Sequence, residues 1–217
     1  MNKVVSLEQI RPLLKDGMSI MIGGFLACGS PEKLIDLLIE TNVKNLTIIA
    51  NDTSFVELGI GKLIVNGQVK KVIASHIGTN AETGRLMTEG KMEVELVPQG
   101  TLIERIRAAG AGLGGVLTPT GVGTMVEEGK QKLTIEGKEY LLELPLKADL
   151  ALVYASVTDE IGNSLYYGTT RNFNPTIATA AEIVIVEAQS IVKIGEIDPN
   201  NIVTPSVFVD YIVKGGN

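Results

Sequence analysis

Cysteine, histidine and tryptophan are nearly absent from this 217-residue chain, which contains one Cys, one His and no Trp. A single cysteine excludes an internal disulfide and suits a reducing compartment. Without a cluster of His, Cys, Asp and Glu at ligand spacing, we expect no metal site. No apolar run is long enough to span a bilayer, and Met1-Asn2-Lys3 does not open a secretory signal. We therefore expect a cytoplasmic protein without a membrane partner.

Positive charge is also in short supply, because 19 Lys and Arg residues against 25 Asp and Glu give a formal net charge of −6. This balance argues against nucleic acid as the main partner, although helix ends and loops of an acidic protein still bind anions. The apolar share of 45% is ordinary for a globular protein, and the length suffices for one sizeable core. With no internal repeat or linker-like stretch, we expect a single domain over residues 1–217.

Strands and helices are expected to alternate along most of the chain. Apolar runs indicate strands at 18–22, 45–50, 69–74, 92–97, 149–153 and 183–186, and a last apolar run covers 207–213. Periodicity and capping residues indicate helices at 6–14, 31–41, 55–62, 82–89, 101–109 and 174–181. The alternation predicts an α/β fold with an open, mostly parallel sheet flanked by helices. Residues 131–143, on either side of Glu136-Gly137, predict a small β-hairpin outside that sheet.

The segment from Asp16 to Pro31 has the clearest local pattern. Its apolar run Ile20–Ile22 indicates a buried strand, and Gly23-Gly24 indicates a tight turn that lets a ligand or another backbone approach closely. Ser30 is expected to cap a helix that has Pro31 at its first position. The turn would lie at the carboxyl end of a strand, where open α/β sheets place their ligands.

Motifs along the chain resemble those of one enzyme family. Gly23-Gly24-Phe25 is followed by three free positions, Gly29, one free position and Pro31. In order there follow Ala50-Asn51-Asp52 and residues 73–78, 97–101, 118–124, 159–163 and 171–175. Together they resemble the alpha subunits of family I CoA-transferases over nearly the whole chain, most of all the bacterial acetate/butyrate–acetoacetate CoA-transferases.

The resemblance implies ping-pong transfer of CoA between short-chain carboxylic acids through a covalent glutamyl-CoA thioester. In this family the glutamate belongs to a Ser-Glu-Asn-Gly motif of the beta subunit. The candidates in this chain are Glu57, Glu104, Glu127, Glu128 and Glu160, and none is followed by Asn-Gly. The chain is therefore expected to be half of an enzyme, paired with a homologous beta subunit in an α2β2 assembly, with CoA as a substrate and no cofactor.

Two amides, Gln99 and Asn51, are the candidate catalytic residues. Each follows an expected strand, and neutral amide donors stabilise the oxyanion that forms when an acyl carbonyl is attacked. Taken alone, the sequence favours a structural role for both, with Gln99 as a helix N-terminal residue and Asn51 as an Asx-turn residue. The family resemblance favours the catalytic role for both, more firmly for Gln99. Gly23, Gly24 and Phe25 are the candidate substrate-binding residues, and they also fit a plain strand-to-helix turn.

Other features are assigned structural roles or left open. Gly110–Gly115 satisfies G-x-G-x-x-G, but it follows a helix rather than a strand, which argues against a dinucleotide site. Cys28 is interpreted as a small turn residue. Residues 110–124 form a long Gly/Thr/Pro loop that lines either the acyl pocket or a subunit interface, and Lys70-Lys71 belongs either to a strand edge or to a site that attracts the CoA phosphates.

Two functions of other classes compete with CoA transfer. A sugar-phosphate isomerase or deaminase of similar fold would work as a single chain with its own acid/base pair, and no such pair stands out in the sequence. A non-catalytic ligand-sensing module would bind without turnover, and nothing resembles an attached DNA-binding element. Activity without a partner would favour the first, and binding without turnover the second.

Overall fold

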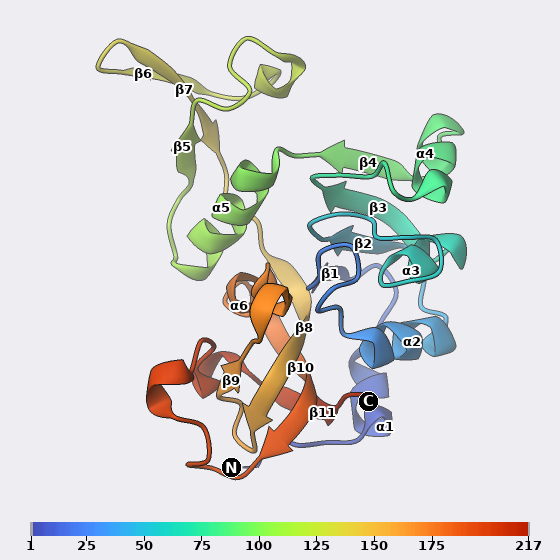
Figure 1. Cartoon of the computed structure of the whole chain (residues 1–217). Coiled ribbons are helices and arrows are strands. Elements are labelled where there is room, and N and C mark those ends of the chain that lie inside the picture. Colours follow the sequence, from blue (N-terminus) through green and yellow to red (C-terminus); the bar gives the residue numbers. More distant parts are fainter. Residues whose placement is uncertain (1, 217) are drawn as a thin grey trace.

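The computed structural model describes residues 2–216, and within them an eight-stranded sheet forms the centre (Figure 1). Its order is β11-β10-β8-β1-β2-β3-β4, all parallel, and β9 pairs antiparallel with β8. The strands are β1 (Ser19–Ile22), β2 (Leu46–Ile49), β3 (Val69–Ala74), β4 (Glu93–Leu96), β8 (Ala148–Asp159), β9 (Ser164–Leu165), β10 (Ala181–Val192) and β11 (Tyr211–Lys214). The predicted open parallel sheet is confirmed.

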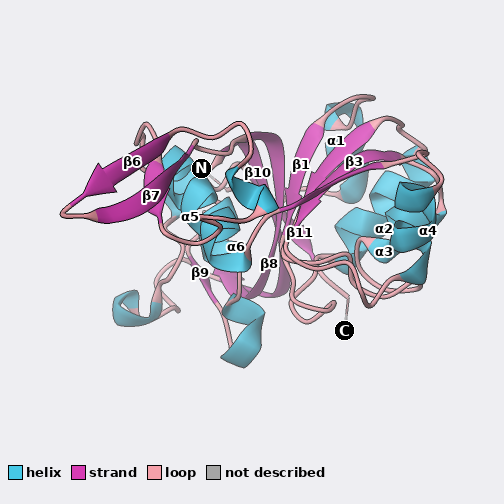
Figure 2. Ribbon diagram, turned by 90° about the horizontal axis from the view of Figure 1, so that it is seen from above, coloured by secondary structure: helices cyan, strands magenta, loops and turns pink. Residues whose placement is uncertain are grey.

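Helices cover both faces of this sheet (Figure 2). One face carries α1 (Leu7–Ile10), α2 (Glu32–Thr41), α3 (Gly61–Val65) and α4 (Ala81–Thr88), and the other carries α5 (Gln99–Gly110) and α6 (Asn174–Ile177). Short 3-10 turns are η1 (Arg11–Leu13), η2 (Met125–Glu127), η3 (Gly168–Arg171), η4 (Pro199–Asn201) and η5 (Ser206–Phe208). None of these helices, over residues 2–216, has the length and apolar character needed to cross a membrane.

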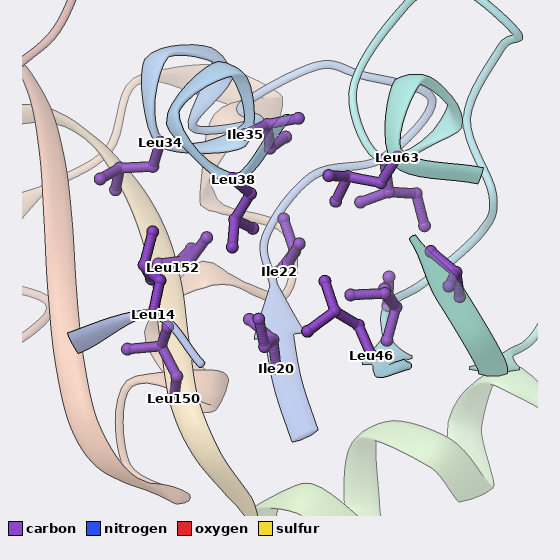
Figure 3. Packing of buried hydrophobic residues seen from close by; sticks show 14 of the residues in the cluster. Leu14, Ile20, Ile22, Leu34, Ile35, Leu38, Leu46, Leu63, Leu150 and Leu152 are labelled. Carbon is purple, nitrogen blue, oxygen red and sulfur yellow. The ribbon is translucent and has the colours of Figure 1, made fainter. Parts of the chain in front are cut away.

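The alternation of side chains in β1 builds the two cores. Ile20 and Ile22 are buried against α2, while Met21 between them packs on the opposite side with residues of α5 and α6. Figure 3 shows Leu38 of α2 beside Ile22, and Leu34 of the same helix over Leu152 of β8. Because β1 is buried on both faces, its run is continuously apolar, as parallel strands require.

The order in which the chain adds strands to the sheet reverses at β1. Strands β1 to β4 follow one another outward, and the chain then returns to place β8 on the other side of β1. Ligands of open α/β sheets bind outside the carboxyl ends of the strands at such a switch point. The residues after β1, β2, β3 and β4 therefore lie where a ligand is expected.

A small antiparallel sheet projects from the body (Figure 1). It has the order β5-β7-β6, from β5 (Val116–Thr118), β6 (Lys132–Ile135) and β7 (Lys138–Glu143). The predicted hairpin is confirmed, and Glu136 and Gly137 have the positive φ of its tight turn, 51° and 78°. The expectation of a loop over residues 110–124 is wrong in part, because residues 116–118 form strand β5. This strand pairs with β7, which lies more than twenty residues later in the chain.

Helix α2 begins differently from the prediction. Its first residue is Glu32, Pro31 occupies the cap position, and no side chain of the preceding turn caps it, so the proposed Ser30 cap is wrong. Instead Glu187 of β10 lies under the helix start and accepts the N–H of Leu34 at 3.1 Å. Glu187 is only 4% exposed, and its burial raises the pKa of the carboxyl to about 7 against the opposing effect of the Leu34 and Lys33 N–H groups.

Several boundaries also differ from the expected ones. The first helix ends at Ile10 and continues as a 3-10 turn, and the weak helix expected at 55–62 is a turn followed by α3. Conversely, β8 and β10 each run for twelve residues, well beyond 149–153 and 183–186. The two strands pair with each other as far as Asp159 and Val192. The additional residues therefore belong to the strands because of this backbone pairing, and not because they are apolar.

Glu187→Gln is expected to change the pH dependence of stability. The folded pKa of Glu187 lies above the unfolded value of 4.5, so its contribution is fully present below pH 4.5 and is lost as the pH rises through about 7. At 1.4 kcal/mol per pKa unit, the variant should gain up to about 3 kcal/mol relative to wild type across this window. Urea unfolding at a series of pH values measures it, with exposed Glu182→Gln on the same strand as control. Parallel profiles for wild type and Glu187→Gln would contradict the prediction.

Candidate active site

The turn after β1 is constrained by packing within the chain itself. Gly23 continues the parallel pairing by donating its N–H to the carbonyl of Leu152 at 3.0 Å. A Cβ at Gly23 would overlap Oδ1 of Asn174, and a Cβ at Gly24, where φ is +130°, would overlap Oγ of Ser30. Both glycines are therefore required by neighbouring side chains, whether or not a ligand approaches them.

Residues 25–28 form a tight, exposed turn. Phe25 and Cys28 exchange two backbone hydrogen bonds of 3.0 and 2.9 Å, and the two residues between them, Leu26 and Ala27, have φ of 47° and 69°. Such values are uncommon for residues other than glycine and cost energy that the surroundings must offset. Phe25 is 45% exposed, and Cys28 ends the turn at the surface, in agreement with its interpretation as a turn residue.

Two asparagine side chains form hydrogen bonds to the backbone of this turn and of the residues beside it. Asn172 accepts the Gly24 N–H at 3.2 Å and donates to the carbonyl of Cys28 at 2.9 Å. Asn174 donates to the carbonyl of Gly29 at 2.9 Å and accepts the N–H of Tyr154 at the same distance. The motif at 171–175, to which sequence reasoning assigned no role, thus supports the turn and offsets its strained backbone.

The two candidate catalytic amides are in direct contact. Asn51 follows β2, Gln99 begins α5 after β4, and Nε2 of Gln99 donates to Oδ1 of Asn51 at 2.6 Å. Asn51 in turn donates through Nδ2 to Oδ2 of Asp52 at 2.6 Å. Asn51 is buried and Gln99 is exposed, so the pair runs from the protein interior to the surface.

These amides open onto a pocket of about 240 Å³ at the carboxyl edge of the sheet. Its lining consists of residues that follow β1, β2, β3 and β4: Phe25, Leu26, Asn51, Asp52, Ser75, His76 and Gln99. Of the predicted site residues, Gln99, Asn51 and Phe25 meet here, whereas Gly23 and Gly24 lie behind the turn in a much smaller cavity. His76 and Asp52 belong to motifs that carry the family resemblance, but neither residue type alone indicates an acyl site.

The pocket can stabilise negative charge, but the described residues that line it supply no carboxylate that is free of hydrogen bonds. Its one carboxylate belongs to Asp52, which is 5% exposed and already accepts N–H groups on both oxygens. The amide hydrogens of Gln99 and Asn51, and the start of helix α5, offer neutral donors and a positive dipole end instead.

Other candidate features lie outside this pocket. The G-x-G-x-x-G segment follows helix α5, which ends at Gly110, and leads into strand β5 at Val116. This order is the reverse of a dinucleotide site and confirms the prediction that the segment follows a helix. The carboxylates of Glu93 and Glu95 hold Lys71 at 2.7 and 3.0 Å and raise its pKa, which favours the strand-edge interpretation. Across residues 2–216 there is no group of three or more His, Cys, Asp or Glu side chains that suits a metal ion.

The family model described as Coenzyme A transferase matches residues 6–215. The chain belongs to this family. It is 58% identical over 213 residues to the acetoacetyl-CoA:acetate/butyrate CoA transferase alpha subunit of Clostridium acetobutylicum, covering 98% of both chains. It is 59% identical over 211 residues to the acetate CoA-transferase subunit alpha of Escherichia coli K12, covering 97% of this chain and 96% of the other.

Solved structures of CoA-transferases share the fold. The acyl-CoA transferase of Escherichia coli O157:H7, solved as a thioester complex with CoA, superposes with a TM-score of 0.87 at 24% identity. That match covers 98% of this chain but only 47% of the other, so the chain spans about half of that enzyme. Glutaconate CoA-transferase of Acidaminococcus fermentans gives a TM-score of 0.83 at 20% identity, over 98% of this chain and 75% of that one.

Proposed function

We propose that this chain is the alpha subunit of a CoA-transferase that moves CoA between short-chain carboxylic acids such as acetate, butyrate and acetoacetate. The observation that carries the proposal is the Gln99–Asn51 contact at the edge of a pocket whose one carboxylate is fully engaged. Such a site offers oxyanion donors without a carboxylate that is free of hydrogen bonds. Relatives of nearly the same length that are named alpha subunits support the same conclusion.

In the proposed reaction, a glutamate of a homologous beta subunit attacks the thioester carbonyl of acyl-CoA. The C–S bond breaks, CoA leaves as the thiolate, and a mixed anhydride remains. The thiolate then attacks the glutamyl carbonyl, which releases the first acid and leaves the glutamyl-CoA thioester, and a second acid reverses these steps. Gln99 and Asn51 stabilise the oxyanions, Phe25 lines the acyl pocket, and Gly23 and Gly24 hold the turn close to it.

The proposal requires two kinds of subunit, two copies of each, and CoA as a substrate with no further cofactor. The chain purified alone is expected to show no transfer from acetoacetyl-CoA to acetate. A beta subunit that contains Ser-Glu-Asn-Gly should restore it, and the same subunit with glutamine in place of that glutamate should not. Acetoacetyl-CoA consumption measures turnover, and light scattering measures the assembly.

Two results would reject the proposed function. One is turnover by the chain alone, which the isomerase or deaminase hypothesis would predict on sugar phosphates. The other is a covalent CoA adduct on an acidic side chain of this subunit, detected by mass spectrometry of the intact protein after incubation with acetoacetyl-CoA. Family membership leaves the sugar-phosphate and ligand-sensing alternatives without supporting evidence.

A further inference from the structure

Asp52 is the point at which the strained turn and the amide pair meet. Its Oδ2 accepts the N–H of Leu26 at 3.0 Å and Nδ2 of Asn51 at 2.6 Å, while Oδ1 accepts the N–H of Ser54 at 2.7 Å. Within residues 2–216 it forms no ion pair. The carboxylate is thus a buried group that does nothing except accept N–H groups from this site.

An amide side chain has a donor end and an acceptor end of nearly the same shape, so a chain of two amides can run in either direction. Asp52 removes this freedom because its carboxylate is occupied as an acceptor on both oxygens. Asn51 must turn Nδ2 toward Asp52, which leaves Oδ1 for its other neighbour. Gln99 must then present Nε2, as the observed contact shows.

The direction matters because each amide nitrogen carries a second hydrogen. Nε2 of Gln99 and Nδ2 of Asn51 each make one hydrogen bond within residues 2–216, and both residues line the pocket. In the opposite direction, Oε1 of Gln99 would occupy the place of Nε2, and an acceptor would face a developing oxyanion. We propose that Asp52 is a positioning residue that sets the direction of the Gln99–Asn51 pair and so supplies the pocket with N–H donors; this rests on the proposed function.

Asp52→Asn tests the proposal with almost no change of shape. The introduced side chain has one acceptor oxygen for three donors, so one of its faces now donates and lets Asn51 and Gln99 reverse. In the reconstituted enzyme we expect kcat to fall about 10- to 100-fold, a typical loss for a supporting residue, with KM nearly unchanged. The loss should be clearly smaller in the Gln99→Ala background, because only the Asn51 amide is then left to orient.

Asp159→Asn is the matched control. Asp159 is another buried carboxylate, 3% exposed, whose Oδ1 accepts the N–H groups of Ile161, Gly162 and Asn163 while Oδ2 accepts Nδ2 of Asn163. It anchors a turn away from the pocket, so its variant should lower the melting temperature but leave kcat close to wild type. A full, additive loss from Asp52→Asn in the Gln99→Ala background would overturn the proposal, because that is the behaviour of a purely structural anchor.

A second readout needs neither a partner nor turnover. In ¹⁵N-labelled alpha chain, the side-chain NH₂ signals of Asn51 and Gln99 should shift or double in Asp52→Asn and stay in place in Asp159→Asn. If Asp52→Asn does not fold, Gln99→Glu serves instead: with Asp52 intact, Asn51 should keep its wild-type NH₂ signal rather than reverse toward the new carboxylate. Unmoved signals in Asp52→Asn, or a reversed Asn51 in Gln99→Glu, would overturn the proposal even if CoA transfer itself were disproved.

Discussion

Gln99→Ala is expected to lower kcat of the reconstituted enzyme by about two to three powers of ten, the usual cost of removing one oxyanion donor. KM for the acid should change little, since the lost N–H group acts on charge that develops in the transition state. Truncation also removes the donor that Oδ1 of Asn51 accepts at 2.6 Å. Steady-state kinetics with acetoacetyl-CoA and acetate measure both constants.

Two further variants make this result specific. Gln99→Glu has the same shape but places an acceptor against Oδ1 of Asn51 and against the oxyanion, so it should lose at least as much activity as alanine. Gln189→Ala is the control, because Gln189 is also exposed and its side chain also forms one short hydrogen bond outside the pocket, in which Oε1 accepts from the Tyr154 hydroxyl at 2.6 Å. A kcat of Gln99→Ala within a factor of about three of wild type would remove Gln99 from the mechanism, because even weak oxyanion donors contribute more.

Local patterns were sufficient to predict the parallel sheet. Strands such as Ile20–Ile22 are buried on both faces and therefore read as unbroken apolar runs, and the helices between them have their own periodicity. The placement of Asn51 and Gln99 at one edge followed from the same rule, since both come directly after parallel strands. That they touch depends on β3 alone separating β2 from β4, and strand order is not visible in a single sequence.

What could not be predicted depends on contacts between distant parts of the chain. Glu187, rather than nearby Ser30, lies under the start of α2, and the two residues that bond, Glu187 and Leu34, are 153 positions apart. Asn172 reaches Gly24 across 148 positions. Capping rules describe a helix end by its own neighbours, so they miss a cap that the sheet supplies.

Asp52 shows a different limit. It lies next to a predicted site residue in the same motif, yet its role depends on three donors from Leu26, Asn51 and Ser54 that converge only after folding. The one indication in the sequence is an aspartate next to an asparagine at the end of a strand, because an ionised carboxylate can only accept hydrogen bonds and so can orient the neighbouring amide. Spacing alone does not distinguish such an anchor from an ordinary turn residue.

Gly23→Ala is expected to destabilise the fold strongly, by about 3 kcal/mol, at the upper end of the cost of overpacking a core. The added methyl group would overlap Oδ1 of Asn174, which is fully buried and bonded to the N–H of Tyr154, so neither side can move without breaking hydrogen bonds. For a chain of this length the melting temperature should fall by roughly 6 to 12 °C. Gly84→Ala is the control: it lies inside α4 with open space around it, and should gain about 0.5–1 kcal/mol.

A double-mutant cycle with Asn174→Ala separates packing from backbone effects. Asn174→Ala alone should be costly, because it leaves the Tyr154 N–H and the carbonyl of Gly29 without their partner. It also removes the atoms that an alanine at position 23 would strike, so adding Gly23→Ala to this variant should cost much less than in wild type. If the two losses simply add, then backbone conformation rather than Asn174 requires glycine there. A strong coupling would instead show that the turn carrying Phe25 and Leu26 keeps its place beside the amides because Asn174 occupies the space that every other residue at position 23 would need.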